Sequence, residues 1–211
     1  MSHSLSVRAL ACLLACATVT GALASPAAAA PRKMQMSSST SIDAGTRSRC
    51  SITLISDTLA YSAAHCFAFK AKVGDPVTRA HRVIGHITAD GMSQPAGKRI
   101  DAVRIALDPD AVTVLSPHEI GDSLALRTGD IVHRTGVSSS SVGPMLDDAA
   151  KIVRYRETGD IATRCVDATS RPGDSGSAVL DAQEKVVGIL THGPGDHEYC
   201  FAPIDLAEAM S

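Results

Sequence analysis

Ser175 lies in a glycine-rich stretch, residues 171–179, that suits a serine nucleophile. A serine hydroxyl is a weak nucleophile, so it needs an adjacent base and hydrogen-bond donors for the oxyanion that it creates. Gly173 and Gly176 permit a sharp turn because they carry no Cβ. The N–H groups of Gly173 and Ser175 would then point to one spot above the hydroxyl. The same composition is also typical of a surface turn. The catalytic interpretation therefore requires a base from another part of the chain.

His65 is the candidate for that base. It lies in the segment 62–66, Ser-Ala-Ala-His-Cys, at the end of a predicted strand. Cys50 precedes Cys66 by sixteen residues, which suits two neighbouring strands joined across a hairpin. A base must be held within hydrogen-bond reach of its nucleophile, and a position beside a covalent anchor would hold it. A solvent-exposed histidine is the alternative interpretation.

Asp101 is the candidate that would orient His65. It stands near the start of the alternating segment 99–107, which predicts a strand. The alternative interpretation is an aspartate that begins a strand in solvent. Asp90 is the nearest upstream alternative, but it lies in a predicted loop.

Short alternating segments separated by turn residues predict an all-β fold. The predicted strands cover residues 51–55, 59–61, 82–87, 99–107, 130–136, 150–155, 161–166, 178–180, 186–190 and 199–202. Residues 138–143 are predicted to form a turn, and one or two helical turns are expected after Pro203. A boundary between two similar halves is placed at residues 115–119. The crossover helices of a doubly wound fold are missing, and Ser175 leads into a strand rather than a helix.

Composition and charge exclude several classes of function. The hydrophobic content of 45% is enough for a sizeable core, and 3% aromatic residues mean that Val, Ile, Leu and Ala build it. The formal net charge is −2, and lysine and arginine are scattered along the chain. A nucleic-acid-binding protein would show a basic patch, and a polybasic membrane anchor would show a run of positive charge.

The first thirty residues are typical of a secretory signal peptide, with Arg8 before an apolar stretch rich in small residues. Cleavage is expected after Ala24 or within the alanine run 27–30, and an uncleaved anchor is the alternative. Residues 31–41 lack apolar periodicity and are predicted to be a disordered start, with a very short pro-segment as the alternative. Four cysteines remain after cleavage, which suggests two disulfides with three possible pairings. No C-x-x-C motif is present to suggest zinc.

With His65, Asp101 and Ser175 in that order along the chain, the sequence resembles the chymotrypsin-like serine proteases. Within them it is most similar to the small secreted bacterial branch, the streptogrisin-like enzymes of actinobacteria. The resemblance covers roughly residues 42–210. It implies two antiparallel six-stranded β-barrels, at about residues 42–117 and 118–211, with a short C-terminal helix.

The resemblance also implies a role for individual residues. Ser175 would be the nucleophile, His65 the general base and then acid, and Asp101 the group that fixes the tautomer of His65. The N–H groups of Gly173 and Ser175 would form the oxyanion hole. The residues implied in substrate binding are Thr169, Thr191, His192 and Gly193. The pairings implied for the cysteines are Cys50–Cys66 and Cys165–Cys200, the second bracing the loops of the first specificity pocket.

Arg134 matches an internal arginine that, in the bacterial branch, pairs with the aspartate before the nucleophile, here Asp174. If so, no newly freed N-terminal amine is needed for activity. The alternative is that Arg134 is a solvated strand residue. The loop from Cys165 to Pro172 is longer than in the bacterial relatives, so the preferred substrate side chain stays open.

The function expected from these residues is that of a secreted serine endopeptidase working through a Ser-His-Asp triad and an acyl-enzyme. The expected partners are a polypeptide substrate and a proteinaceous inhibitor. No nucleic acid, cofactor or metal is expected, nor a membrane after signal cleavage, and the protein is expected to be a monomer. The alternative is a catalytically inactive, protease-like binding module of the cell envelope, although such modules usually lack a triad residue and none is missing here.

Overall fold

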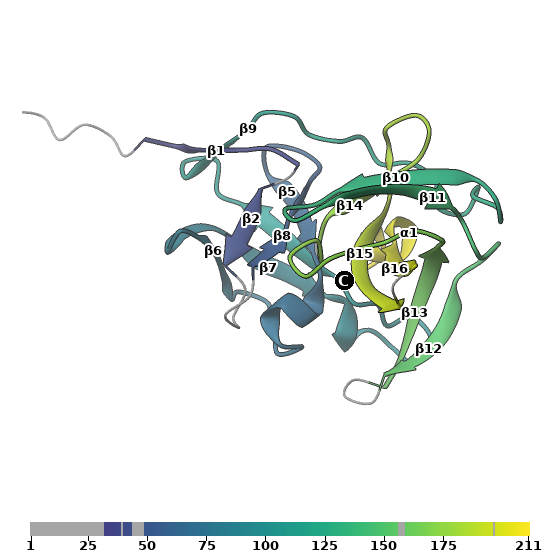
Figure 1. Cartoon of the computed structure of the whole chain (residues 1–211). Coiled ribbons are helices and arrows are strands. Elements are labelled where there is room, and N and C mark those ends of the chain that lie inside the picture. Colours follow the sequence, from purple (N-terminus) through teal and green to yellow (C-terminus); the bar gives the residue numbers. More distant parts are fainter. Residues whose placement is uncertain (1–31, 39, 44–48, 156–158, 196) are drawn as a thin grey trace, which may run out of the picture. The chain divides into compact units, whose positions relative to one another are not determined.

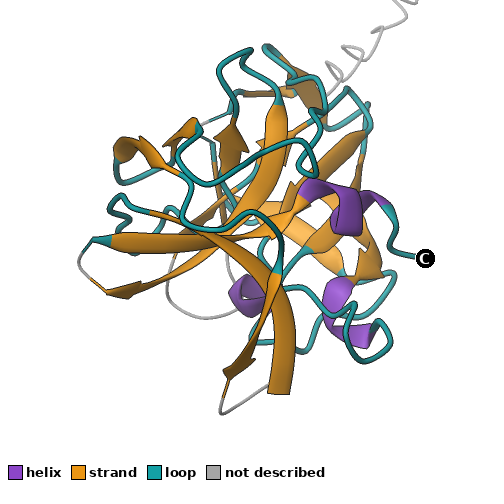
Figure 2. Cartoon of the chain, turned by 90° about the vertical axis from the view of Figure 1, so that its right-hand side faces the viewer, coloured by secondary structure: helices purple, strands orange, loops and turns teal. Residues whose placement is uncertain are grey.

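The structure is a computed structural model that describes residues 32–211 except 39, 44–48, 156–158 and 196. The chain divides into two units, residues 1–30 and 31–211, and the predicted signal peptide lies outside the described residues. The second unit is built almost entirely from strands and loops (Figure 2). Among the residues that the structure describes, no helix has the length and apolar character needed to cross a lipid bilayer.

Seven strands form the first sheet, in the order β3-β2-β6-β7-β8-β5-β4. Figure 1 labels β2, β6, β7, β8 and β5 of this sheet. Their neighbours pair antiparallel. β8 shows why these segments form strands, because Val103, Ile105 and Leu107 are buried and the residues between them are not. The bounds are β2 (Ser41–Asp43), β3 (Arg49–Ser51), β4 (Thr53–Leu54), β5 (Leu59–Ser62), β6 (Pro76–Arg79), β7 (Arg82–Asp90) and β8 (Val103–Leu107).

Seven further strands form the second sheet, in the order β11-β10-β14-β15-β16-β13-β12. These pairs are also antiparallel. The bounds are β10 (Ile131–Thr135), β11 (Ser140–Pro144), β12 (Lys151–Tyr155), β13 (Gly159–Val166), β14 (Ala178–Leu180), β15 (Val186–Gly195) and β16 (Glu198–Pro203). The helix α1 (Ile204–Glu208) follows β16 directly.

The all-β fold with one C-terminal α-helix agrees with the prediction, and two details differ from it. Each sheet holds seven strands rather than six, and in the first sheet Ile52 separates β3 from β4. The predicted turn at residues 138–143 is largely strand β11, which pairs with β10 from Ile131↔Pro144 to Thr135↔Ser140. Serine and glycine gave this segment the composition of a turn, but its pairing with β10 makes it a strand.

The prediction of disorder for residues 31–41 is wrong for the segment that the structure describes as β1 (Met34–Met36). β1 pairs in parallel with β9 (Val112–Val114), and Met36 is 1% exposed. Val112 and Val114 are buried in the same cluster as Met36. Apolar contacts with residues far along the chain therefore order a segment that has no clear periodicity of its own.

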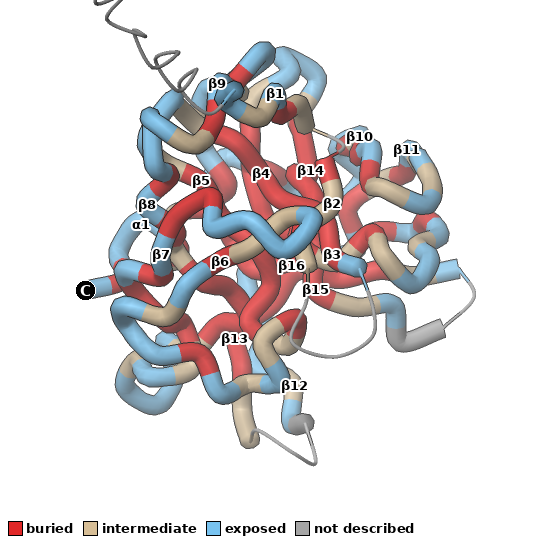
Figure 3. The backbone as a smooth tube through the Cα atoms, turned by 90° about the vertical axis from the view of Figure 1, so that its left-hand side faces the viewer, coloured by how far each residue is buried: buried red, intermediate tan, exposed pale blue. Residues whose placement is uncertain are grey.

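Three clusters of buried apolar residues form the core. Figure 3 shows the buried residues in red, and many of them lie on the strands. One cluster belongs to the first half of residues 31–211 and one to the second half. The third joins the halves, because Tyr61 and Ile100 from the first pack with Ala178, Ile189 and Ile204 from the second. The two sheets are therefore fixed against each other by apolar contacts, which is what a site between them requires.

Both disulfides have the predicted pairing, Cys50–Cys66 and Cys165–Cys200. Cys50 lies in β3, and Cys66 lies in the 3₁₀ helix Ala64–Phe67 that follows β5. Cys165 and Cys200 lie opposite each other on the paired strands β13 and β16. The second disulfide thus links two neighbouring strands of the sheet, whereas the resemblance implied a brace between loops.

Candidate active site

His65 is held against Asp101 by two contacts. The backbone N–H of His65 donates to Asp101 Oδ1 at 2.8 Å, and His65 Nδ1 lies 2.7 Å from Asp101 Oδ2. An ionised carboxylate only accepts hydrogen bonds, so Nδ1 carries the proton in this contact. The neutral ring then presents an unprotonated Nε2, which is the form that a general base requires.

The fold supplies this geometry from two elements. His65 lies in the 3₁₀ helix after β5, and one of its ring nitrogens is within 4.8 Å of the sulfur atoms of Cys50 and Cys66. Asp101 lies just before β8 and is 3% exposed. β5 and β8 are paired, with Ser62 opposite Val103. Strand pairing and the disulfide therefore both place the histidine beside the aspartate.

Asp90, the alternative orienting residue, is used elsewhere. Its carboxylate accepts from Met92 N at 3.0 Å and from Ser93 Oγ at 2.8 Å, so it caps the short 3₁₀ helix that begins at Gly91. Asp101 is the aspartate that contacts His65 in the structure. Burial lowers the pKa of His65, but the hydrogen bond and the charge of Asp101 outweigh burial, so the pKa lies above its ordinary value.

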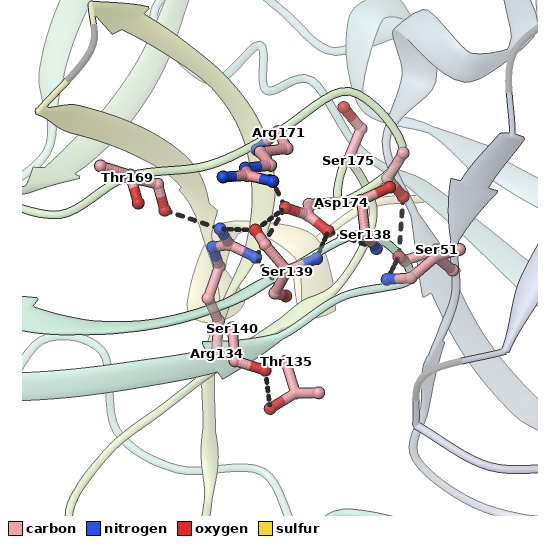
Figure 4. Close-up of polar contacts among 12 residues, drawn as sticks. Ser51, Arg134, Thr135, Ser138, Ser139, Ser140, Thr169, Arg171, Asp174 and Ser175 are labelled. Atoms are coloured by element: carbon pink, nitrogen blue, oxygen red, sulfur yellow. Dashed lines mark hydrogen bonds and ion pairs between the residues drawn. The ribbon is translucent and has the colours of Figure 1, made fainter.

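Asp174, the residue before Ser175, accepts an unusually large number of hydrogen bonds (Figure 4). Its Oδ1 accepts from the backbone N–H groups of Ser138 and Ser139 at 2.9 Å each. Its Oδ2 accepts from the backbone N–H of Arg171 at 2.9 Å and from Ser139 Oγ at 2.5 Å. Burial raises the pKa of Asp174, but these hydrogen bonds and Arg134 outweigh burial and leave the pKa below its ordinary value.

Arg134 forms a fully buried ion pair with Asp174. Arg134 Nη1 lies 3.0 Å from Asp174 Oδ2, and both side chains are 0% exposed. Strand alternation explains the burial of Arg134, because β10 turns Val132 and Arg134 to the same inner face. The guanidinium also donates from Nη2 to Thr169 O at 2.6 Å and lies 5.4 Å from the ring centre of Tyr199. The interpretation of Arg134 as a solvated residue does not hold.

The backbone of the turn around Ser175 is fixed at successive carbonyl groups. Pro172 O accepts from Ser138 Oγ at 2.7 Å, and Gly173 O accepts from Ser51 Oγ at 2.9 Å. Asp174 O accepts from Ser177 N at 3.0 Å. Within the described part of the chain, the N–H groups of Gly173 and Ser175 donate to no protein acceptor. These two donors are therefore available to a group from outside the chain.

The turn lies against the segment that precedes His65. A Cβ added at Gly176 would lie 2.4 Å from Ser62 Oγ and 3.2 Å from Ala63 N, so no larger residue fits there without a shift. Among the residues that the structure describes, Ser175 Oγ and the ring of His65 are not joined by a hydrogen bond. Ser175 Oγ instead donates to Thr191 O at 3.3 Å. Catalytic hydrogen bonds are often long before substrate binds.

The residues predicted to bind substrate lie on two segments. Thr191, His192 and Gly193 are in β15, and Thr169 is in the loop between β13 and β14. Thr191 is buried, and its hydroxyl donates to Cys200 O at 3.0 Å and lies 2.9 Å from His192 Nδ1. Burial lowers the pKa of His192. The charge of Asp101 raises this pKa, and the charge of His65 lowers it. His192 therefore lies in the electrostatic neighbourhood of the His65–Asp101 pair.

Ser51, Ser138 and Ser139 contribute to the site, but the sequence does not predict their roles. Ser51 is separated from Gly173 by 122 residues, and Ser138 is separated from Pro172 by 34 residues. Serine is common in loops, and no local pattern marks one that binds a distant carbonyl. The run of serines at 138–141 was the one visible signal, and it was interpreted as a turn.

The comparisons with known proteins agree with this arrangement. The model of the protein family named Trypsin matches residues 24–205. The chain belongs to the trypsin family. No curated protein matches the chain. The resemblance to chymotrypsin-like serine proteases is thereby confirmed at the level of the family.

Solved structures of trypsin-family proteins show the same fold. Cellulomonas bogoriensis chymotrypsin is 21% identical, with 83% of this chain and 97% of that chain covered at a TM-score of 0.63. Thermobifida fusca protease A is 22% identical, with 81% and 93% covered at a TM-score of 0.60. A glutamic-acid-specific serine protease, described as using a histidine triad in substrate binding, is 19% identical, with 82% and 95% covered at a TM-score of 0.63.

Proposed function

We propose that this trypsin-family chain is a secreted serine endopeptidase in which Ser175, His65 and Asp101 form the catalytic triad. The observation that carries the proposal is the double contact of Asp101 with His65, which fixes the tautomer with a proton on Nδ1. A base in this form can take the proton of Ser175 Oγ through Nε2. The fold and family support hydrolysis of peptide bonds as the reaction class.

In the proposed reaction, Ser175 Oγ attacks the substrate carbonyl carbon while its proton passes to His65 Nε2. The negative charge that develops on the carbonyl oxygen is stabilised by the N–H groups of Gly173 and Ser175, which donate to no acceptor among the described residues. His65 then gives its proton to the leaving amine, and an acyl-enzyme remains. Water then gives a proton to His65 and attacks the ester carbonyl. The bond to Ser175 Oγ breaks, the acid product leaves, and His65 returns the proton to Ser175 Oγ. Asp101 stays ionised and stabilises the charged imidazolium.

The buried pair of Arg134 and Asp174 supports a site that is assembled without a new N-terminal amine. Asp174 is already paired and fully hydrogen-bonded within the chain. Its position sets the turn that carries Ser175. We infer that the enzyme needs no cleavage of an activation peptide beyond removal of the signal segment.

The proposed substrate is a polypeptide in extended form that pairs with β15 at Thr191–Gly193. Thr169 and His192 are proposed to lie next to the side chain that precedes the cleaved bond. The glutamic-acid-specific relative uses histidines for its substrate, and His192 is the residue of this chain that would serve such a side chain. A proteinaceous inhibitor would pair with the same strand, β15.

We propose that the protein is exported. The grounds are the signal-like residues 1–30 and the two disulfides, which form in oxidising compartments. An enzyme that acts alone as a monomer outside the cell is consistent with these features. The alternative of an inactive binding module is not favoured, because the histidine and aspartate of the triad are in contact and the serine is present.

A fluorophosphonate probe tests the proposal, since it reacts with an activated serine and not with an ordinary one. The oxidised protein should be labelled at Ser175, as located by peptide mass spectrometry. His65→Ala should abolish labelling because the base is lost, whereas His86→Ala, which changes an exposed histidine of β7, should not. Absence of labelling in folded protein with both disulfides intact would refute the enzyme and favour the binding module.

A further inference from the structure

The hydroxyl of Ser138 contacts the turn of the nucleophile at one specific atom. Ser138 lies between β10 and β11, and its Oγ donates to the carbonyl oxygen of Pro172 at 2.7 Å. Its backbone N–H donates to Asp174 Oδ1 at 2.9 Å, so the residue itself is fixed in place (Figure 4). The hydroxyl is thus a donor held at a set position beside the Pro172–Gly173 peptide.

The position of the Pro172 carbonyl determines the direction of the next N–H. The Pro172–Gly173 peptide is trans and planar, so its C=O and N–H point in opposite directions. Because the carbonyl points to Ser138, the N–H of Gly173 points away from Ser138. That N–H donates to no acceptor within the described residues, as expected of a group kept for a ligand.

The rest of the turn leaves this peptide dependent on Ser138. The following carbonyl, of Gly173, has its own donor in Ser51, and that of Asp174 has its own donor in Ser177. The donor to Pro172 O is Ser138 Oγ. Gly173 has a φ of +105°, a region open mainly to glycine, and its neighbouring peptides can rotate more readily than those of other residues. A Cβ at Gly173 would lie 2.4 Å from Ser138 Oγ, which shows how close the two segments are.

We propose that Ser138 is a positioning residue for the reaction, and that its hydroxyl holds the Pro172–Gly173 peptide with the Gly173 N–H facing the oxyanion. The proposal rests on the proposed function. Without the hydroxyl, Pro172 O loses its donor, and a rotated peptide becomes accessible. Rotation removes one of the two oxyanion donors and turns a carbonyl oxygen towards the developing negative charge. The effect falls on the transition state, where the charge develops, and not on the bound substrate.

The test compares Ser138→Ala with Ser138→Thr and with Ser140→Ala. Threonine keeps the hydroxyl. Ser140 is an exposed serine of the same segment whose Oγ donates to Thr135 Oγ1 at 3.2 Å, away from the turn. Ser138→Ala should lower kcat about tenfold with KM unchanged, which is less than the roughly 10²–10³-fold known for loss of a whole oxyanion donor, because the Gly173 N–H is displaced in only part of the population. Ser138→Thr should recover most of the rate, and Ser140→Ala should match the unaltered protein.

A second readout separates this proposal from the proposed function. Crystal structures of the unaltered protein and of Ser138→Ala show the orientation of Pro172 O directly, whether or not the protein cleaves peptides. Rotation of that carbonyl, or two orientations of it, in Ser138→Ala alone supports the proposal. An unchanged carbonyl, a kcat equal to that of Ser140→Ala, or a loss carried by KM instead of kcat would overturn it. Failure of the unaltered protein to hydrolyse peptides counts against the endopeptidase only, and the carbonyl orientation then decides the role of Ser138.

Discussion

The backbone N–H of Ser51 donates to the carbonyl oxygen of Ser175 at 2.7 Å, which joins the first sheet to the residue proposed as nucleophile. The side chain of the same serine donates to Gly173 O at 2.9 Å and accepts from Val137 N at 3.0 Å. One small residue of β3 therefore contacts both the nucleophile turn and the segment between β10 and β11. The two halves of the domain meet here through hydrogen bonds as well as through the apolar cluster around Tyr61.

Replacing Ser51 by alanine should destabilise the protein by about 1–3 kcal/mol, because Gly173 O and Val137 N both lose a partner in a partly buried place. Denaturant unfolding with the disulfides intact measures the change. Ser56→Ala provides the control, since the Ser56 hydroxyl lies near Thr58 in an exposed turn. Equal stability of the two variants would contradict the importance of this contact.

Replacing Arg134 by methionine should destabilise the protein by about 3–5 kcal/mol, because the Asp174 carboxylate stays buried without its cation. Labelling by the fluorophosphonate should fall as well, since Asp174 sets the position of the turn. Arg154→Met removes an arginine from an exposed pair with Asp160 and should leave both stability and labelling almost unchanged. A double variant, Arg134→Met with Asp174→Asn, measures how much of the loss comes from the unpaired carboxylate.

Activity should fall as the pH drops through a pKa of His65 that lies above the ordinary value of 6.5. Protonation of Nε2 removes the base, so the acidic limb of the kcat/KM profile reports this group. Asp101→Asn should move that limb to lower pH, because burial lowers the pKa of His65 and the negative charge that raises it is then absent. The same change should lower kcat by about 10⁴-fold, the size known for a serine-protease triad. An unmoved acidic limb would show that another group titrates.

The stability contributed by His65 should change with pH in the opposite direction to activity. Its folded pKa is raised, so the stabilisation is complete below the pKa of the unfolded chain and is lost as the pH rises through the folded pKa. Thermal unfolding of the unaltered protein and of His65→Gln across the neutral range would show this difference. A constant difference between the two proteins would contradict the raised pKa.

Acid should unfold the protein partly through Asp174. Its folded pKa lies below the ordinary value of 3.8, so its stabilisation is present above that value and is lost as the pH falls through the folded pKa. Ser139→Ala removes a hydrogen bond to this carboxylate and should move the acid-unfolding midpoint to higher pH. Circular dichroism during acid titration measures the midpoint, and Ser140→Ala should not change it.

The sequence was informative where function depends on local residue type. The motif around Ser175, the Ala-His-Cys segment and the alternation of β8 predicted the serine turn, the histidine beside a disulfide and the strand next to Asp101. These features need only neighbours within a few residues. The pairing of the cysteines and of Arg134 with Asp174 came from resemblance, because charge and spacing alone left other partners open.

The features that could not be predicted depend on contacts between distant parts of the chain. Met36 is buried because β9 pairs with β1. Ser51 contributes to the site because its hydroxyl donates a hydrogen bond to Gly173 O. Neither residue differs locally from one in a loop. The position of the Pro172 carbonyl is likewise set by Ser138, which belongs to another strand connection. Tertiary contacts, and not local propensity, determine these positions.

The two disulfides have a consequence for the order of oxidation during biosynthesis. They close spans of 16 and 35 residues, and each joins cysteines that are consecutive among the four cysteines of residues 31–211. If the chain is exported N-terminus first and residues 1–30 are removed, as proposed above, Cys66 emerges when Cys50 is the one earlier thiol, long before Cys165. Pairing each thiol with the preceding free one therefore produces the native connectivity directly. Such a chain would need oxidant in the compartment where it folds, but little reshuffling of mispaired bonds by an isomerase.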